Sequence, residues 1–391
     1  MRIAGGLLAL VLVAACASRL DSPRRTSENG VEIVDNGARM FALPDGPRRL
    51  SLREEFRIDL EDESLAAEGL GDISAMDVDS RGRIYVFGLL GPGPFVFQFD
   101  GSGRFLKSFA GQGQGPGEVM YPHFAGIAGT DEIWVYSQGA QKLVSFDAEG
   151  REVHSRPVPT EWHFLASRFR MLANGNVLAQ RARTDEDGSP TALVLSLFDG
   201  GFEKIADIHE YSLPFQGQRI EEFLAVMPLI GTGDDSFATN CGSRGRDIAV
   251  FGLDGRRTRV IRAVFPEVGV PDGYRRAILE LTPPDSEFRN IRQFFESVTN
   301  FPPFQSLIVD DAGRLYAAGF GRDPETGANA CDVFSPDGVR FLRTAIGYGD
   351  LFRFALASER RDVVIKNGRC YGVREKSDGF KEVVVRTMTW E

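Results

Sequence analysis

The chain has few of the thiol and imidazole side chains on which zinc sites and histidine-based catalysis depend. Its 391 residues include 4 cysteines, 4 histidines and 3 tryptophans. No Cys-x-x-Cys pair occurs, which argues against a structural zinc site. The Gly-x-Ser-x-Gly elbow of many hydrolases and the His-Glu-x-x-His pattern of zinc proteases are also absent. With only His123, His154, His163 and His209, few candidates exist for a histidine-based acid, base or metal cluster.

An excess of positive charge and a membrane-spanning segment are missing as well. Lysine and arginine number 45 against 55 aspartate and glutamate, a net charge of -10. Such a field repels phosphate backbones and anionic lipid headgroups, so we expect no nucleic-acid partner. Beyond residues 3–15, no segment approaches the 18 consecutive apolar residues of a transmembrane helix.

The composition is that of a folded chain rich in turns. Hydrophobic residues make up 42% and charged residues 26%, which allows a sizeable core and argues against disorder. The 30 phenylalanines, 44 glycines and 20 prolines favour many short strands separated by turns. Length alone allows two or three average domains or one large repetitive domain.

The N-terminus has the pattern of an export signal. A basic Arg2 precedes the apolar run at residues 3–15, which is too short to span a bilayer as a mature helix. Val13-Ala14-Ala15-Cys16 then resembles the lipobox of bacterial lipoproteins. The resemblance implies removal of residues 1–15, diacylation of Cys16 on sulfur, and a chain tethered to a lipid bilayer. An ordinary signal with a chance cysteine is the alternative.

The residues after Cys16 bear on location and on distance from the membrane. Ala17, not Asp, follows the cysteine, which resembles the pattern sent to the outer membrane in double-membraned bacteria. We therefore expect a cell-envelope location, with the outer membrane favoured over the inner one. Residues 16–48 are polar and turn-rich, and we predict a flexible tether with one short extended segment at residues 31–34. Such a tether would span on the order of 30 Å.

Three further cysteines remain in the predicted mature domain. Cys241, Cys331 and Cys370 are an odd number in a chain predicted to be exported, so at most one disulfide can form among them. We favour small buried apolar residues in strands over one disulfide.

A unit of two hairpins recurs along the chain. Residues 73–109 read as strand, Asp/Gly turn, strand, loop, strand, Asp/Gly turn and strand, with apolar residues at alternate positions. Four later stretches repeat this order, and the second turn of each unit falls at Asp100, Asp147, Asp199, Asp254 and Asp337. The intervals are 47, 52, 55 and 83 residues. A four-stranded unit of this size is typical of a propeller blade. A β-sandwich is the alternative, but its Greek-key order does not predict five similar consecutive units.

The remaining residues complete a sixth unit. The long interval contains an insertion at residues 272–298, for which helical spacing predicts one or two short helices that either carry function or cap the core. Residues 363–389 supply only three strands, and residues 50–60 can supply the missing outer strand. The prediction is an all-β, six-bladed propeller over residues 49–391, with four-stranded antiparallel blades and an N-terminal strand that closes the last blade.

The connection after the first unit carries a family resemblance. Residues 109–118, FAGQGQGPGE, with Tyr121-Pro122 after them, resemble the Gly-x-Gly-x-Gly-Pro-Gly-x-Phe segment between blades of NHL-type six-bladed propellers. Val119 stands where those proteins usually have Phe. Residues 301–304 and 363–386 are similar to bacterial six-bladed β-propeller lipoproteins. The resemblance implies the fold and says little about activity, because propellers include enzymes, receptors and scaffolds.

The same glycines could suggest a phosphate-binding loop. However, Pro116 removes an N–H donor, no Lys-Ser/Thr follows, and no helix pattern comes next. We predict a structural role, in which glycine lets the linker pass close to the backbone.

Candidate ligand-binding residues lie just before each predicted inner strand, because those positions converge at one mouth of the central channel. They are Asp72, His123, His163, Arg168, Glu222, Gln305 and Arg353. Such a ring could bind a small polar or anionic ligand, or a cation at the carboxylates. The alternative is that they are solvated loop residues, with the arginines paired to neighbours.

Two hypotheses about function follow. The first is a monomeric, membrane-anchored lipoprotein without a cofactor that binds or scaffolds an envelope protein, peptide or glycan. The second is a metal-dependent lactonase, lyase or hydrolase in the central channel, with a divalent cation such as calcium held by Asp72, Glu222 or Asn300. A sensory ectodomain is less favoured, because no transmembrane helix would carry a signal inward. The sequence leaves open whether the protein is an enzyme.

Overall fold

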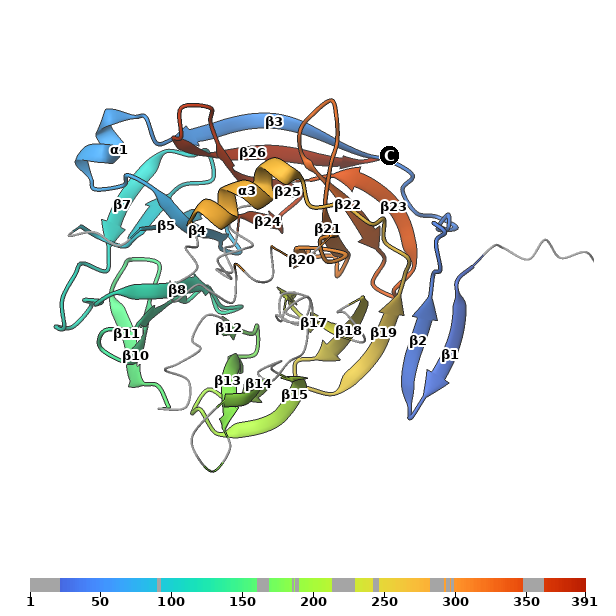
Figure 1. The fold of residues 1–391 in the computed structure, drawn as a ribbon. Helices are drawn as coiled ribbons and strands as arrows, with labels where there is room; N and C mark the ends of the chain where they lie inside the picture. Colours follow the sequence, from blue (N-terminus) through green and yellow to red (C-terminus); the bar gives the residue numbers. More distant parts are fainter. Residues whose placement is uncertain are drawn as a thin grey trace, which may run out of the picture.

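The chain folds into six β-sheets arranged as a ring (Figure 1). This computed structural model describes residues 22–89, 93–159, 169–184, 186, 190–212, 229–241, 246–281, 292, 296, 299–346 and 362–391. Within every sheet the strands of one repeat unit are antiparallel neighbours in chain order. The predicted six-bladed β-propeller is confirmed.

The first three blades each contain four consecutive strands. Blade I comprises β4 (Ile73–Val78), β5 (Ile84–Gly88), β6 (Val96–Phe99) and β7 (Phe105–Phe109). Blade II comprises β8 (Pro122–Ile127), β9 (Ile133–Ser137), β10 (Lys142–Phe146) and β11 (Glu152–Pro157). Blade III comprises β12 (Phe169–Met171), β13 (Val177–Thr184), β14 (Pro190–Phe198) and β15 (Lys204–Ser212).

The other three blades follow the same order, and two of them recruit N-terminal strands. Blade IV comprises β16 (Ile230–Thr232), β17 (Ser236–Cys241), β18 (Asp247–Gly252) and β19 (Arg257–Arg262), extended by β2 (Val31–Asp35) and β1 (Arg24–Glu28). Blade V comprises β20 (Ser306–Val309), β21 (Leu315–Arg322), β22 (Asn329–Phe334) and β23 (Arg340–Ala345). Blade VI comprises β24 (Val363–Lys366), β25 (Arg369–Glu375), β26 (Lys381–Trp390) and β3 (Leu50–Asp59).

The recurring turns form because an aspartate caps them locally. In blade I the Asp100 carboxylate accepts hydrogen bonds from the backbone N–H groups of Ser102 and Arg104, at 2.9 and 3.0 Å. Gly103 closes this turn at a φ of 84°, which a side chain would disfavour. Asp147 and Asp199 act in the same way. In blades IV and V the equivalent turns begin at Gly252 and Ser335. These residues lie two positions before Asp254 and Asp337, at which the sequence placed the turns.

The ring closes as predicted. Strand β3 lies antiparallel to β26, from Leu50 opposite Trp390 to Asp59 opposite Glu382. One blade thus combines the last strands of the chain with a strand from near its beginning, which ties the two ends together and covers a sheet edge.

The extended segment predicted at residues 31–34 is confirmed as β2, but residues 24–35 together correct the prediction of a flexible tether at residues 16–48. Strand β2 runs parallel to β19, with Arg259 opposite Glu32 and Arg262 opposite Asp35, and β1 folds back on β2. This hairpin lies on the rim of the ring (Figure 1). The outer strand of blade IV has unpaired backbone groups, and pairing satisfies them. The prediction was wrong here because the partner strand lies more than 200 residues away in sequence.

The chain continues from β2 across the rim to blades V and VI. Phe41 donates its backbone N–H to Arg340 O at 2.8 Å, and Arg49 exchanges backbone hydrogen bonds with Glu391. We refer to residues 22–50 as the N-terminal strap. It contacts the outer edges of the last three blades, so the folded domain includes residues that were predicted to precede it.

Apolar side chains fill the faces between blades. Between blades III and IV, Phe237 and Phe251 stack with ring centroids 5.0 Å apart, in one cluster with Leu178 and Leu195. Cys241, Cys331 and Cys370 are buried in these layers as free thiols, in agreement with the favoured prediction.

Helices are few among the described residues. Helix α1 (Glu63–Ala67) lies between blades VI and I, and α3 (Asp272–Leu281) lies in the predicted insertion after blade IV. Most of the second predicted helical stretch of the insertion is outside the described residues. No described helix is long and apolar enough to cross a membrane.

Candidate functional site

The structure describes two of the predicted mouth residues together with their side chains, Asp72 and Gln305. Asp72 directly precedes β4 and Gln305 directly precedes β20, so both lie at the start of inner strands, as expected. His123 lies in β8, but its side chain is outside the described part. His163, Arg168, Glu222 and Arg353 also lie outside the described residues, as does Cys16. Their convergence at the mouth stays a prediction.

The carboxylate of Asp72 is engaged within the protein. It accepts a hydrogen bond from the Ile73 backbone N–H at 2.6 Å and forms an ion pair with the Lys381 ammonium. Lys381 is 7% exposed, and its ammonium also lies 3.4 Å from Ile73 O. Because Lys381 belongs to blade VI and Asp72 to the entry of blade I, this pair joins the first and last blades. The sequence could not show it, since 309 residues separate the two.

The two amides near blade V are also used internally. Gln305 donates from its side chain to Gly319 O at 2.7 Å. Asn300 donates weakly to Glu267 at 3.5 Å and is exposed. Among the described residues, no three His, Cys, Asp or Glu side chains are grouped so that they could hold a metal ion.

In the glycine-rich connection between blades I and II, backbone N–H groups donate to carboxylates of the chain itself. Gly115 donates to the Glu118 carboxylate at 2.8 Å, and Gly117 donates to the Glu152 carboxylate. A Cβ at Gly113 would lie only 1.9 Å from Glu118 Oε2. The positions that a phosphate loop leaves open to an anion are thus taken by carboxylates of the chain, which supports the predicted structural role.

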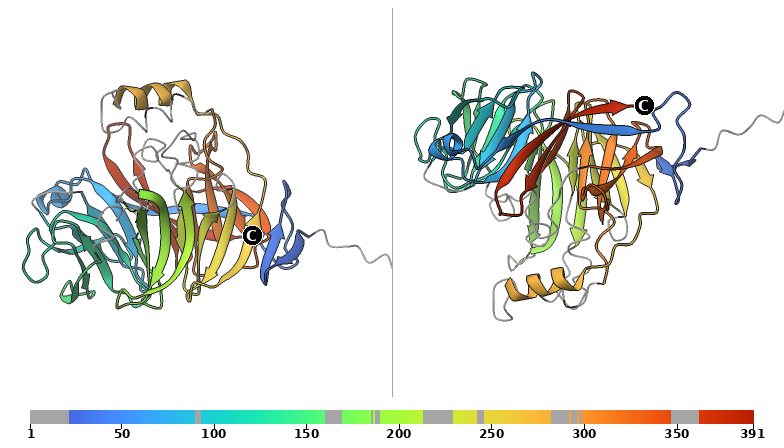
Figure 2. Two further views of the ribbon diagram at one scale, coloured as in Figure 1. Left: turned by 60° about the horizontal axis from the view of Figure 1, so that its bottom comes forward. Right: turned by 90° about the horizontal axis from the view of Figure 1, so that it is seen from above.

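The insertion after blade IV forms a projecting structure on one face of the ring. Helix α3 stands away from the strands in both views of Figure 2. An aromatic series supports it: the Tyr274 ring meets Phe301 edge-on at 5.5 Å, and Phe301 stacks on Phe320 of β21 at 4.3 Å. Ile278 is 2% exposed in the same cluster. The helix is therefore fixed against the propeller.

The opposite side of α3 is polar and open to solvent. Asp272, Arg276 and Glu280 are exposed there, at positions four residues apart, which lie on one face of a helix. We call these three residues the α3 surface. It presents both signs of charge on a rigid support, which suits recognition of a polar partner.

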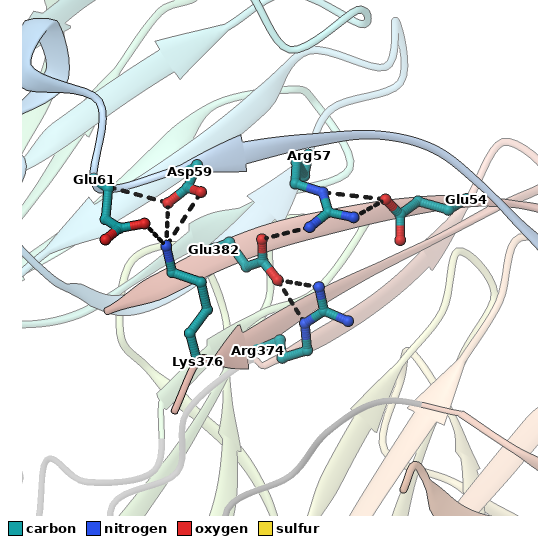
Figure 3. Close-up of polar contacts among 7 residues, drawn as sticks. All are labelled: Glu54, Arg57, Asp59, Glu61, Arg374, Lys376 and Glu382. Atoms are coloured by element: carbon teal, nitrogen blue, oxygen red, sulfur yellow. Dashed lines mark hydrogen bonds and ion pairs between the residues drawn. The ribbon is translucent and has the colours of Figure 1, made fainter. Parts of the chain in front are cut away.

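A second group of charges lies on the closing blade and was not foreseen. Glu382 is fully buried in β26 and receives Arg374 Nε from β25 at 2.5 Å and Arg57 Nη1 from β3 at 3.3 Å (Figure 3). Arg57 also contacts the Glu54 carboxylate. The three valines that follow Glu382 predict only an apolar strand, so no sequence signal marked it. Because Glu382 pairs with arginines of both β3 and β25, it links β3 to the rest of the blade.

Comparison with known proteins supports the fold. Residues 66–172 match the model of a family described as 6-bladed beta-propeller, DUF5128. This part of the chain is similar to that family. The matched propeller segment comprises the end of α1, blade I, blade II and the start of blade III. No curated protein matches the chain.

Solved structures resemble the propeller over most of its length. A Bacteroides fragilis protein, whose export is proposed but not proven, has a TM-score of 0.52 at 9% identity. The match covers 92% of this chain and 99% of that protein's chain. A DUF4221 family member from Bacteroides vulgatus has a TM-score of 0.49 at 11% identity, covering 88% and 100%. Virginiamycin B lyase from Staphylococcus aureus has a TM-score of 0.44 at 12% identity, also covering 88% and 100%. At 9% identity the likeness to the first concerns the fold alone.

Proposed function

We propose that this propeller is a cell-envelope lipoprotein, anchored through acylated Cys16, that binds a protein, peptide or glycan with its α3 surface. The observation that carries the proposal is the position of α3, which projects from the ring and is held there by the packing of its Tyr274 on Phe301, which stacks on Phe320 of β21. A ten-residue helix is marginal in isolation, so its order reflects this packing. An ordered projection with a polar outer side is suited to binding without a large entropic cost.

The proposed location rests on the lipobox-like Val13-Ala14-Ala15-Cys16 and on Ala17. The similar Bacteroides fragilis protein is assigned as exported, which agrees with an envelope location. Two or more acyl chains would give stable anchoring, and the outer membrane is favoured in a double-membraned host.

Site-specific photo-crosslinking in intact cells tests the binding role. A photoreactive residue at Arg276 should yield a crosslinked envelope component, whereas the same residue at Arg104, on a turn of blade I, should not. Arg104 is a suitable control because its side chain is 77% exposed. Equal products from both positions, or none from Arg276, would contradict the α3 surface as the binding site.

The anchor is tested separately by the mass of the N-terminal peptide from envelope-extracted protein. Acyl chains on Cys16 and release of a Cys16→Ser variant into the soluble fraction are expected. An unmodified Cys16 at the membrane would contradict lipidation.

A further inference from the structure

The rim beside the entry of the chain carries two exposed apolar side chains. Val264 is 60% exposed, the most of any large apolar residue among those described, and Met40 is 52% exposed. The N-terminal strap brings their backbones into the same part of the rim, because the Val264 backbone N–H donates to Gly37 O at 2.7 Å, three residues before Met40. Single exposed apolar side chains are common on protein surfaces, so the case for an interface here depends on where the chain enters the fold and on the charge nearby.

The register of the strap places this pair next to the start of the described chain. Arg24 is opposite Asp35 in the β1–β2 hairpin, and the Asn36 backbone N–H donates to Arg262 O at 2.9 Å. The chain thus enters the fold at the same end of the hairpin as residues 37–40 and Val264. Pro23 is already buried, so the fixed part begins there.

The distance to the proposed anchor is short. Arg24 follows Cys16 by eight positions, and a fully extended chain of this length spans at most about 28 Å. A lipid on Cys16 would therefore hold this part of the rim close to the bilayer, in place of the long flexible tether that the sequence predicted.

Although the whole chain carries a net charge of -10, the exposed charges nearest the pair are positive and suit a lipid headgroup layer. Arg24 and Arg39 are exposed beside it. Guanidinium groups bind phosphate through several N–H donors, and methionine and valine can enter the boundary between headgroups and acyl chains. We call Arg24, Arg39, Met40 and Val264 the rim patch.

We propose that the rim patch rests on the lipid surface to which the protein is anchored, so that the propeller docks on the membrane by the rim of blades IV and V. The proposal depends on the lipid anchor of the proposed function for its geometry. Docking fixes the orientation of α3 relative to the bilayer, whereas a domain on a flexible tether would have no fixed orientation.

Hydroxyl-radical footprinting with mass spectrometry tests the docking on native side chains. Residues 16–391 are coupled through Cys16 to a maleimide lipid in vesicles of phosphatidylcholine and phosphatidylglycerol. Because Cys241, Cys331 and Cys370 are buried, the coupling is selective. The free chain capped with N-ethylmaleimide is the reference, and this design does not depend on acylation in cells.

Three side chains elsewhere on the rim serve as matched controls. Leu106, Val153 and Ile205 occupy outer strands of blades I, II and III and are 42%, 42% and 46% exposed. Oxidation of Met40 and Val264 should fall about fivefold on vesicles, as expected when a half-exposed side chain becomes about 10% exposed. Oxidation at the three controls should not change.

Several outcomes would overturn the docking. They are unchanged oxidation of Met40 and Val264, uniform protection at all five positions, or protection in the free chain that grows with its concentration, which would indicate a second copy as the partner. In support, Met40→Glu with Val264→Glu should abolish the protection of that rim segment, while Leu106→Glu with Val153→Glu should leave it intact. A failure here with acylated Cys16 in cells refutes docking alone, whereas an unmodified Cys16 refutes the anchor.

Discussion

The side-chain oxygen of Asn36 accepts a hydrogen bond from the backbone N–H of Arg340 at 2.8 Å, although 304 residues separate them. The amide nitrogen of Asn36 donates to Gly338 O at 3.0 Å and to Arg262 O at 3.3 Å. One asparagine, 2% exposed, therefore joins the N-terminal strap to the outer strands of blades IV and V.

Replacing this residue should loosen the strap. Asn36→Ala leaves the Arg340 N–H and the Gly338 carbonyl buried without partners, so we expect a loss of about 2 kcal/mol in the free energy of unfolding. Urea unfolding followed by circular dichroism measures it. Arg48→Ala is the control, because Arg48 contacts Glu391 through its backbone and its exposed side chain should contribute less than about 0.5 kcal/mol. Equal losses in both variants would contradict the role of the amide.

The buried carboxylate on the closing blade should matter more than its exposed neighbour. Glu382→Gln removes the charge that Arg57 and Arg374 face, and we expect a cost of about 2–3 kcal/mol, below that of a fully buried pair because both arginines are partly exposed. Glu54→Gln alters a partner of the same Arg57 at the surface and should cost less than about 1 kcal/mol. Chemical denaturation of the two variants side by side makes the comparison. A similar cost for both would mean that burial of Glu382 is unimportant.

Stability should depend on the protonation of His209. Burial lowers the pKa of His209 below its ordinary 6.5, and Arg257 lowers it further, while Glu210 opposes the change. The unfolded state therefore binds a proton more readily than the folded state, so this contribution to stability is complete above pH 6.5 and is lost as the pH falls below it. Melting temperatures between pH 7.5 and 5.5 should decline less in His209→Gln than in the parent chain. Parallel curves would show that another group is responsible.

The three internal thiols should be unreactive in the folded protein. Burial raises the pKa of Cys241 to about 11 and that of Cys370 to about 12, and Cys331 is buried in the same cluster as Cys370. Ellman's reagent at pH 8 should detect no thiol in residues 17–391 when folded and three after unfolding in guanidinium. A count of one after unfolding would reveal a disulfide.

Metal content separates the binding protein from the enzyme. The binding role predicts far less than one calcium ion per chain in purified residues 17–391 after dialysis, and a melting temperature that chelator does not change. One tightly held ion per chain, with activity lost on its removal, would favour the metal-dependent lactonase, lyase or hydrolase.

The sequence predicted those parts of the fold that depend on local rules. The turn at Asp100 needs only the aspartate, two N–H groups and Gly103, all within four residues, and its recurrence revealed the blades. The missing strand of the last blade could be found by counting the predicted strands, because the C-terminal unit had three and each blade needs four. In contrast, β1 is a charged, fully exposed strand that forms only because β2 has paired with the edge of β19. A local pattern cannot report such a partner.

The same distinction applies to the candidate site. Placing Asp72 at the start of an inner strand required only the repeat, but its use depends on Lys381, at the far end of the chain. Likewise Glu382 directly precedes three valines, and its arginine partners come from two other strands. Of the predicted ring, His123, His163, Arg168, Glu222 and Arg353 stay predictions.

The path of the N-terminal strap has a consequence for synthesis. Translation delivers residues 22–59 first, yet β2 must await β19, Asn36 must await Arg340, and β3 must await β26. These contacts span more than 200 residues, so the ring can close only when almost the whole chain has emerged, and such long-range pairing slows folding. During that interval the unpaired strands are exposed to proteases and to other chains, and a chain that ends before β26 lacks the strand with which β3 pairs.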